Sequence, residues 1–424
     1  MSSNGAPGAM PVQEDVTAAA VRPWVSQAFD RPELIGGDRV GLLTNFTGVM
    51  PDFTRNVEAL VAAGVKLTTL FGPEHGLRGV VQAGESKPDG ADPASGLPVL
   101  ETYRVRGEQL TEMFGRSGVD TVVFDMQDIG VRYYTYVWSM FDALCAAARA
   151  GVRFVVLDRP NPLTGAVVAG PRLAKEVSSF VGRVDVPLRH GLTVAELALL
   201  FNTVHLPSVV GTPAQLSVVP MSGWRRSMSF DHTGIPWVAP SPNMPTLDTA
   251  YAFCATGLIE GTNLSEGRGT TAPFQLIGAP YVDDRLAEVL RSRDLPGVLF
   301  RATSFLPAFS KHGGRVVNGI AVHLVDRSAF DPVRTGVEII ATAAELYPGD
   351  FAFLQPGTAG GVAAIDRLWG SSDLRTVVGG GGDPRTLVGR PSTVADSYPD
   401  DVLLYDDRPQ IWLPPGRTGD GPAT

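Results

Sequence analysis

An acid, an imidazole and a guanidinium stand close together in the stretch FGPEHGLRG, as Glu74, His75 and Arg78. An apolar run ends directly before them, at Gly72 and Pro73, and the glycines allow the backbone to approach a ligand closely. In this setting Glu74 can act as a general acid or base, while His75 orients it and Arg78 binds an anion. A solvated surface turn explains the same residues equally well.

A second polar cluster begins where another apolar run ends, in the stretch FDMQDIGVRYYTY. Asp125 closes that run, Asp128 follows it, and Arg132 stands beside Tyr133 and Tyr134. Aromatic rings suit the C–H faces of a sugar, whose hydroxyls hydrogen-bond to acids and amides. Either carboxylate can instead cap the next helix or pair with Arg132.

Two loops further along the chain also carry amide, acidic and basic side chains. The stretch EGTNLSEGRGTTAPF holds Asn263, Glu266 and Arg268 among glycines. Its two acids would repel a phosphate, so the stretch suits a polyhydroxylated or amide-bearing ligand better. In SPNMPT, Asn243 lies between two prolines, where its amide either faces a ligand or forms an Asx turn.

Short apolar runs alternate with helical patterns from about residue 39 onwards. The patterns predict strands over 39–45, 66–72, 120–126 and 152–158, and helices over 54–64, 107–118, 135–151 and 193–204. Residues 73–103 are predicted to be rich in loops. Thr193 and Glu196 are spaced as a capping box for the last of these helices. Near-continuous apolar strands between helices indicate a Rossmann-like, doubly wound α/β fold with a parallel sheet covered on both faces.

The polar clusters fall at the carboxyl ends of these predicted strands. Asn45 follows the first strand, Glu74 the second, Asp125 and Asp128 the third, and Asp158 the fourth. Ligands of open α/β sheets bind at this edge. We therefore expect these side chains to line one crevice.

The chain has 424 residues, which favours two domains over one. We predict a loose N-terminal tail over residues 1–22, a Rossmann-like catalytic domain over 23–280 and a smaller α/β or α+β auxiliary domain over 281–424. The second boundary is placed where the sequence shifts to simpler helix and strand patterns, after about Pro280.

Composition excludes several classes of partner. The net charge of −9 argues against nucleic acid. No run approaches the ~20 apolar residues of a membrane span. The first residues lack the basic and apolar regions of a secretory signal, so we expect a cytoplasmic location.

Spacing also argues against several kinds of cofactor site. No G-x-G-x-x-G follows the first strand, which disfavours a dinucleotide. The histidines and cysteines show no zinc-ligand spacing, so we expect no metal. Cys145 and Cys254 lie in apolar runs and are predicted to be buried thiols.

Seven motifs occur in order along the chain: GLLTNFTGV, LFGPEHGLRG, GLPVLETY, DMQDIGVRYYTYVWSM, VLDRPNPLTG, APSPNMPT and EGTNLSEGRGTTAPFQLIGAP. Together they resemble the family of exo-β-N-acetylmuramidases of the NamZ type, once catalogued as a domain of unknown function. The resemblance extends from about Val21 to Pro414. Two features depart from the family pattern. Family members are often exported, whereas this sequence shows no signal peptide, and Val317 stands where a cysteine is common.

The resemblance implies a Rossmann-like N-terminal domain, a smaller C-terminal domain and a cleft between them. It also implies hydrolytic release of N-acetylmuramic acid from the non-reducing end of peptidoglycan fragments, as in cell-wall turnover and recycling, with no metal or organic cofactor. The expected partner is therefore a saccharide or muropeptide that contains N-acetylmuramic acid, and the sequence is compatible with a dimer.

Glycoside hydrolysis normally uses two carboxyl groups. We expect Glu74 to be the general acid, oriented by His75, with Asp128 or Glu266 as its partner and Asp125 as a further candidate. In a substrate-assisted reaction, Asp125 or Asp128 would polarise the 2-acetamido group instead.

The remaining predicted site residues bind the substrate. Bidentate contacts to the lactyl carboxylate are expected from Arg78, Arg132 and Arg268. Hydroxyl, ring or amide contacts are expected from Tyr133, Tyr134, Asn45, Asn243 and Asn263.

Two other classes of protein fit the same residues. One is a sugar-processing enzyme that depends on a metal or a phosphate and uses the same crevice. The other is a non-catalytic carbohydrate-binding protein, because two domains with a cleft also describe sugar receptors.

Overall fold

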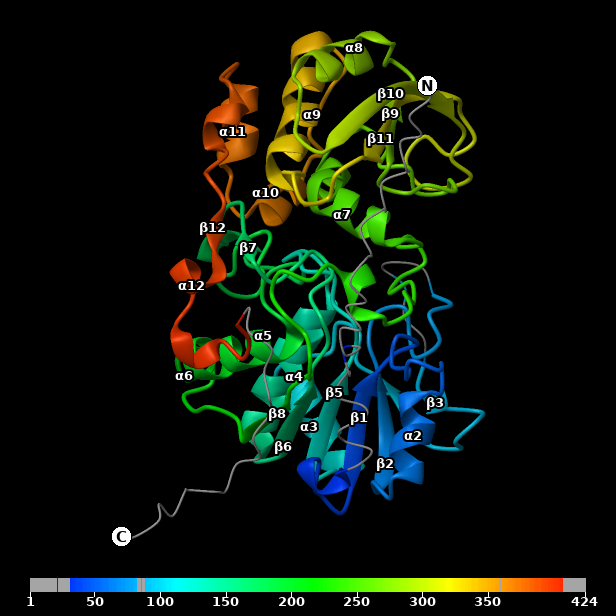
Figure 1. Cartoon of the computed structure of the whole chain (residues 1–424), viewed down its shortest axis with the longest axis vertical. Helices are drawn as coiled ribbons and strands as arrows, with labels where there is room; N and C mark the ends of the chain where they lie inside the picture. Colours follow the sequence, from blue (N-terminus) through cyan, green and yellow to red (C-terminus); the bar gives the residue numbers. More distant parts are fainter. Residues whose placement is uncertain (1–20, 22–30, 82–84, 86–87, 359, 407–424) are drawn as a thin grey trace, which may run out of the picture.

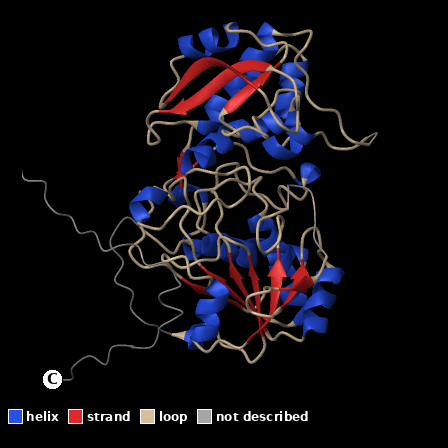
Figure 2. Cartoon of the chain, turned by 90° about the vertical axis from the view of Figure 1, so that its right-hand side faces the viewer, coloured by secondary structure: helices blue, strands red, loops and turns tan. Residues whose placement is uncertain are grey.

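The computed structural model describes residues 21, 31–81, 85, 88–358 and 360–406. Apart from Val21, the predicted N-terminal tail over residues 1–22 lies outside this range. Within it, a large sheet and a small sheet are stacked along the long axis of the molecule, with a layer of loops between them (Figures 1 and 2).

The large sheet has seven strands in the order β3-β4-β2-β1-β5-β6-β8. They are β1 (Val40–Thr44), β2 (Leu67–Gly72), β3 (Gly90–Ala91), β4 (Pro98–Glu101), β5 (Thr121–Asp125), β6 (Arg153–Leu157) and β8 (Leu216–Val219). All neighbours pair in parallel except β3, which is antiparallel to β4. The six parallel strands, numbered along the chain, lie in the order 3-2-1-4-5-6 of a Rossmann fold. The predicted fold class is thus confirmed.

Helices cover both faces of this sheet, because successive strand residues point to opposite sides and both sides are apolar. On one face, Val122 and Phe124 pack in a core with the helices α3 (Glu108–Ser117), α4 (Tyr136–Ala150) and α5 (Val194–Leu200). On the other face, Val123 packs with α2 (Asn56–Ala62).

The ends of the predicted helices follow their sequence signals. Gly118 and Gly151 end α3 and α4 in the left-handed conformation. Thr193 and Glu196 form the predicted capping box of α5. Beyond Leu200 that helix continues as a π-helical turn, Phe201–His205, and the short α6, Leu206–Val209.

The strand β4 lies within the segment predicted to be rich in loops, so that expectation is wrong for Pro98–Glu101. A strand of four residues that begins with a proline is too short to show an alternating pattern. Its presence matters for the site, because the residues after β4 join the edge of the sheet where β2 ends.

The small sheet is antiparallel, with the order β10-β11-β9. Its strands are β9 (Leu276–Ala279), β10 (Val298–Phe305) and β11 (Val317–Leu324), and the helices α7 (Leu247–Thr256), α8 (Arg285–Ser292) and α9 (Pro332–Leu346) pack with it. The predicted boundary between residues 280 and 281 falls directly after β9.

After the small sheet, the chain returns along the side of the molecule to the large one (Figure 1). It passes through α10 (Ala364–Trp369), α11 (Asp373–Gly379), β12 (Ser392–Thr393) and α12 (Val394–Ser397), and β12 pairs with β7 (Val167–Val168). Near its end, Tyr405 donates a hydrogen bond from its hydroxyl to Asp158. The two halves of the chain are therefore tied together on one side.

Candidate active site

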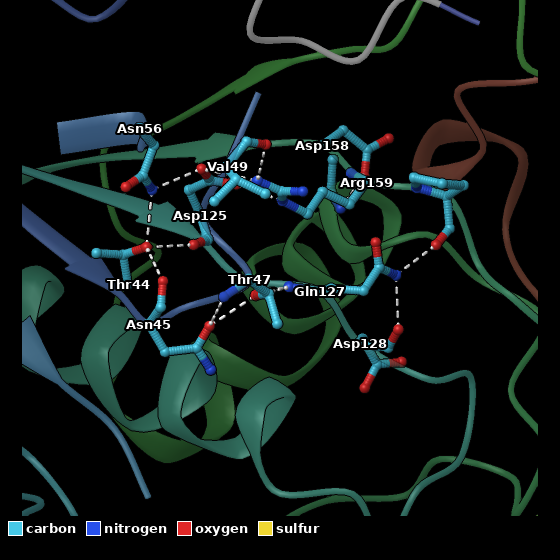
Figure 3. Close-up of polar contacts among 12 residues, drawn as sticks. Thr44, Asn45, Thr47, Val49, Asn56, Asp125, Gln127, Asp128, Asp158 and Arg159 are labelled. Atoms are coloured by element: carbon cyan, nitrogen blue, oxygen red, sulfur yellow. Dashed lines mark hydrogen bonds and ion pairs between the residues drawn. The ribbon is translucent and has the colours of Figure 1, made fainter. Parts of the chain in front are cut away.

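The chain order of the large sheet reverses between β1 and β5, and the polar residues at this point bind one another (Figure 3). Asp125 is fully buried and accepts hydrogen bonds from Arg159 Nε at 2.5 Å, Arg159 Nη2 at 3.1 Å and Asn56 Nδ2 at 2.8 Å. Asn56 Nδ2 also donates to Thr44 Oγ1 at 2.7 Å. The structure thus gives Asp125 the role of a structural ion pair, in place of the predicted contact with substrate.

Asn45 lies beside this network and is also buried (Figure 3). Its Oδ1 accepts hydrogen bonds from the Thr47 backbone N at 2.9 Å and from Thr47 Oγ1 at 2.6 Å. Its Nδ2 has no hydrogen-bond partner among the described residues. Asn45 lines a cavity of 480 Å³ together with Arg78.

Asp128 lies in a second buried pair at the same edge of the sheet. Its Oδ2 accepts hydrogen bonds from the Gly130 backbone N at 2.7 Å and from His190 Nε2 at 3.1 Å. Because the backbone N–H of Leu192 donates to His190 Nδ1 at 3.2 Å, the imidazole proton lies on Nε2. The other oxygen, Oδ1, is buried and has no partner within the described residues.

Glu74 lies at the carboxyl end of β2, in a cavity of 320 Å³ within the loop layer. Its side chain is 7% exposed, and Thr135 Oγ1 donates a hydrogen bond to Glu74 Oε2 at 2.7 Å. His75, which also lines the cavity, has a left-handed φ of 71° and bonds through Nδ1 to the Val81 carbonyl at 2.8 Å. That bond fixes the orientation of the His75 ring.

The walls of this cavity, called here the Glu74 cavity, come from both halves of the chain. The first half supplies Tyr103, Arg104, Tyr133, Tyr134, Thr135, Phe180 and Val181, and the second supplies Ser241, Met244, Phe253, Glu260, Arg268 and Phe274. Burial and the charge of Glu74 raise the pKa of Tyr103 to about 12, so its hydroxyl keeps its proton. Burial likewise raises the pKa of Tyr134, whose hydroxyl has no hydrogen-bond partner among the described residues.

Arg268 carries a positive charge into the Glu74 cavity. Its guanidinium donates to Glu260 Oε1 from Nε at 3.0 Å and from Nη2 at 2.5 Å, and it lies 3.4 Å from Glu266 Oε1. Its carbon Cζ stands 5.0 Å from the centre of the Phe274 ring. These charges, with that of Glu74 nearby, raise the pKa of Arg268 even though its burial acts against them.

Glu266 is not among the residues that line the Glu74 cavity. The side chain is 2% exposed, and Lys311 Nζ lies 3.0 Å from its Oε2. Because Arg268 and Lys311 neutralise it, Glu266 is built into the protein as part of a charged network rather than exposed to a ligand.

Arg132 has a structural role instead of the predicted contact with the lactyl group. It is fully buried, and its guanidinium donates four hydrogen bonds to backbone carbonyls, at Pro171 (2.6 Å), Val186 (2.8 Å), Leu368 (3.0 Å) and Trp369 (2.7 Å). It therefore fastens the first half of the chain to the second and is not presented to the cavity.

Three other predicted residues also lie outside the Glu74 cavity. Arg78 is half-exposed and pairs through Nη2 with the buried Asp92 at 3.1 Å. Asn263 binds the Asp350 carbonyl at 2.7 Å and the Tyr281 hydroxyl at 2.8 Å. Asn243 lines a separate cavity next to the Glu74 cavity.

Of the predicted substrate-binding residues, Tyr133, Tyr134 and Arg268 join Glu74 and His75 in one cavity. The Tyr133 hydroxyl shares its one proton between the carbonyls of Phe253 and Cys254, each at 2.9 Å, so only the ring remains for the cavity. Tyr103 and Arg104 were not among the predicted site residues, although Tyr103 ends the motif GLPVLETY two residues after β4 and Arg104 follows it. Because strand β4 was not predicted, the residues after it were not recognised as part of the candidate site.

Three further findings concern metal ions, membranes and the cysteines. No three His, Cys, Asp or Glu side chains of the described residues gather in a way that would hold a metal ion. None of the helices within the described ranges has the length and apolarity to cross a membrane. Cys145 and Cys254 are buried free thiols, as predicted.

A Rossmann-like sheet whose carboxyl edge forms a cavity with an acid, tyrosines and an arginine defines an α/β protein with a small-molecule site at this edge. Residues 40–248 match the N-terminal domain of the exo-β-N-acetylmuramidase NamZ family, and residues 251–401 match its C-terminal domain. The chain belongs to this family.

Among curated proteins, the chain is similar to the peptidoglycan β-N-acetylmuramidase NamZ of Bacillus subtilis (strain 168). The two are 45% identical over 361 residues, which cover 85% of this chain and 84% of the relative.

Two solved structures of DUF1343 family proteins from Bacteroides fragilis share the fold. The first has a TM-score of 0.74 and 32% identity, and the match covers 84% of this chain and 91% of that one. The second has a TM-score of 0.67 and 24% identity, with coverage of 92% and 100%.

Proposed function

We propose that this protein is an exo-acting glycoside hydrolase that releases N-acetylmuramic acid from the non-reducing end of peptidoglycan fragments. The similarity to a peptidoglycan β-N-acetylmuramidase supports the substrate class. The observation that carries the proposal is the position of Glu74, a largely buried carboxyl group in a cavity of sugar size at the end of a parallel strand.

Glu74 is the general acid of this reaction and gives its proton to the oxygen of the leaving sugar. The hydrogen bond from Thr135 fixes the carboxyl group, and the uncharged Tyr103 hydroxyl supplies a donor close to its negative charge once the proton has left. The ring of His75, fixed by its bond to Val81, forms the adjoining wall.

The second carboxylate is Glu260, because it lines the Glu74 cavity whereas Asp128 and Glu266 do not. The two hydrogen bonds from Arg268 hold Glu260 in one orientation. A glycosidase transition state resembles an oxocarbenium ion, and a fixed negative charge at the cavity wall stabilises it.

A muramic acid differs from a glucosamine by its lactyl ether, which carries a carboxylate. Two arginines line the Glu74 cavity, Arg104 and Arg268, and a guanidinium binds a carboxylate through paired N–H donors. The tyrosine rings of the cavity supply flat surfaces for the sugar.

The direct test is to incubate the purified protein with the β-1,4-linked disaccharide of N-acetylmuramic acid and N-acetylglucosamine and to identify the products. We expect the two free monosaccharides. The isomeric disaccharide with N-acetylglucosamine at the non-reducing end is the matched control and should remain intact. Recovery of the first disaccharide unchanged would reject the proposed activity, and binding without cleavage would favour a carbohydrate-binding protein.

A further inference from the structure

A second cavity, of 730 Å³, adjoins the Glu74 cavity, and the same two segments of chain separate them. In the loop 241–244, Ser241 and Met244 line the Glu74 cavity, whereas Pro242 and Asn243 line the second one. The loop 241–244 therefore contributes to the walls of both cavities.

The same division recurs at residues 268 and 269. Arg268 faces the Glu74 cavity, and Gly269, the next residue, faces the second cavity. The loop 241–244 and residues 268 and 269 therefore both contribute to the walls of the two cavities.

The lining of the second cavity differs in charge from that of the Glu74 cavity. It holds no acidic or basic side chain among the described residues, and its polar groups are the hydroxyls of Thr270, Thr271 and Ser304 and the amide of Asn243. Phe305, Leu306 and Phe309 form an apolar wall. Leu306 is 59% exposed and Phe309 46%, so this wall presents grouped apolar surface, as binding grooves do.

Hydroxyl and amide donors opposite an aromatic wall suit a neutral sugar ring, which has polar edges and apolar faces. A muramic acid, with its carboxylate, would find no cation in this cavity. An N-acetylglucosamine, which lacks the lactyl group, fits its neutral lining. The difference in charge thus matches the alternation of the two sugars in peptidoglycan.

The apolar wall is held in place by the backbone at Gly269. The Ala308 backbone N donates to the Gly269 carbonyl at 2.9 Å. A Cβ at residue 269 would lie 2.7 Å from the Phe309 backbone N, and Gly269 has φ +80°, so a glycine is required for this close approach. The backbone contact sets the wall directly beside Arg268.

Lys311 fastens the same loop by its side chain. Its Nζ donates to the carbonyls of Ile259 and Leu264, each at 2.9 Å, and lies 3.0 Å from Glu266 Oε2. The next residue, His312, bonds through Nε2 to the Asn263 carbonyl at 2.8 Å. Ser310 and His312 adopt left-handed φ values of 68° and 58°, and these anchors hold that strained backbone. Glu266 thus positions the wall.

We propose that the second cavity is the subsite for the leaving-group saccharide: it binds the N-acetylglucosamine that follows the terminal muramic acid, and Phe309 and Leu306 form its stacking wall. The proposal rests on the proposed function, because a leaving-group saccharide occupies the second cavity only if the glycosidic bond is cleaved in the Glu74 cavity.

The test compares two substrates with the same terminal muramic acid. One is the disaccharide with N-acetylglucosamine, and the other is a 4-nitrophenyl N-acetylmuramide, whose leaving group carries no sugar. For Phe309→Ala and, separately, Leu306→Ser, we expect the ratio of kcat/KM for the disaccharide to kcat/KM for the nitrophenyl glycoside to fall about tenfold, which corresponds to ~1.4 kcal/mol. Leu299→Ala, at a residue of β10 that is 58% exposed and does not line the cavity, is the matched control and should keep the wild-type ratio.

The outcomes separate the two proposals. If the wild-type protein cleaves neither substrate, the proposed function fails. If it cleaves both and the ratio stays unchanged in both folded variants, the assignment of the second cavity is overturned while the proposed function stands. A fall of equal size in Leu299→Ala would also overturn the assignment. Thermal melting identifies a variant that fails to fold, and the other variant then decides.

Discussion

The end of β2 and the ends of β1 and β5 lie at the same edge of one sheet, yet their carboxylates have opposite surroundings. Asp125, after β5, is fully buried and paired with Arg159, and Asn56 binds it as well. Glu74, after β2, is held by Thr135 and faces a cavity of 320 Å³. At the point where the chain order reverses, at which ligands of Rossmann folds commonly bind, the protein's own side chains thus bind the carboxylate of Asp125.

This difference separates structural from functional acids. A buried ion pair stabilises the fold only while both partners remain, and removal of one leaves an uncompensated charge. A carboxyl group at a cavity wall, such as that of Glu74, is placed to contact a ligand. The comparison therefore predicts opposite effects of substitution at Glu74 and at Asp125.

The largest expected effect is on catalysis, in Glu74→Gln. Loss of a general acid lowers turnover by a factor on the order of 10²–10⁴, and the folded structure should keep its thermal stability. The loss should be greater with the disaccharide than with a 4-nitrophenyl glycoside, because nitrophenolate leaves without a proton. Steady-state kinetics with both substrates measure the effect.

A matched control for this variant is Glu288→Gln, at an exposed position of α8, which should behave as wild type. Equal losses with both substrates would contradict the assignment of Glu74 as the acid, and near-normal turnover would remove it from the reaction.

The next effect is on stability, in Asp125→Ala. The variant leaves Arg159 buried without its partner, so the free energy of unfolding should fall by about 3–5 kcal/mol. Urea denaturation measures it. Asp185→Ala, which breaks the exposed pair of Arg172 and Asp185, should cost at most about 1 kcal/mol. A similar small cost in Asp125→Ala would show that the buried pair does not stabilise the fold.

The sequence predicted the sheet because its signals are local. The apolar runs, the capping box of Thr193 and Glu196 and the helix-ending glycines each act within a few residues. Two of the predicted site residues, Glu74 and Arg268, lie on polar loops that the fold brings together in one cavity.

The contacts of Arg132 show that local sequence signals do not predict the distant partners of a polar side chain. Its type and its position after a strand suggested a ligand for an anion, but its four carbonyl acceptors lie 39 to 237 residues further along the chain. Whether a polar side chain meets a ligand or another part of the protein depends on those distant contacts. The same reason explains Asn263, which binds the backbone near residue 350.

A third prediction concerns the lactyl group. In Arg268→Ala, and separately in Arg104→Ala, kcat/KM for a nitrophenyl N-acetylmuramide should fall by about 10–100-fold, since a hydrogen bond to a charged group contributes about 1.5–3 kcal/mol. The kcat/KM for the corresponding N-acetylglucosaminide should fall less. The ratio of kcat/KM for the muramide to kcat/KM for the glucosaminide should therefore decrease. A preference unchanged in both variants would show that neither arginine recognises the lactyl carboxylate.

The smallest expected effect is that of Tyr103→Phe. Burial and the negative charge of Glu74 raise the pKa of this phenol from 10.0 to about 12, so it stays protonated and neutral throughout the range from pH 5 to pH 10. Its removal deletes one hydrogen-bond donor near Glu74 and should lower kcat/KM by about tenfold or less.

Since Tyr103 does not titrate below pH 10, the pH profile of kcat/KM in Tyr103→Phe should run parallel to that of the wild type. Profiles measured from pH 5 to pH 10 check this, with Tyr281→Phe, at a tyrosine outside the Glu74 cavity, as the matched control. If an alkaline limb of the wild-type profile disappears in Tyr103→Phe, the hydroxyl itself loses a proton in that range. Tyr103 would then act as an acid in its own right. The edge of the sheet would in that case hold two proton donors, Glu74 and Tyr103, and Glu74 would not be its single functional acid.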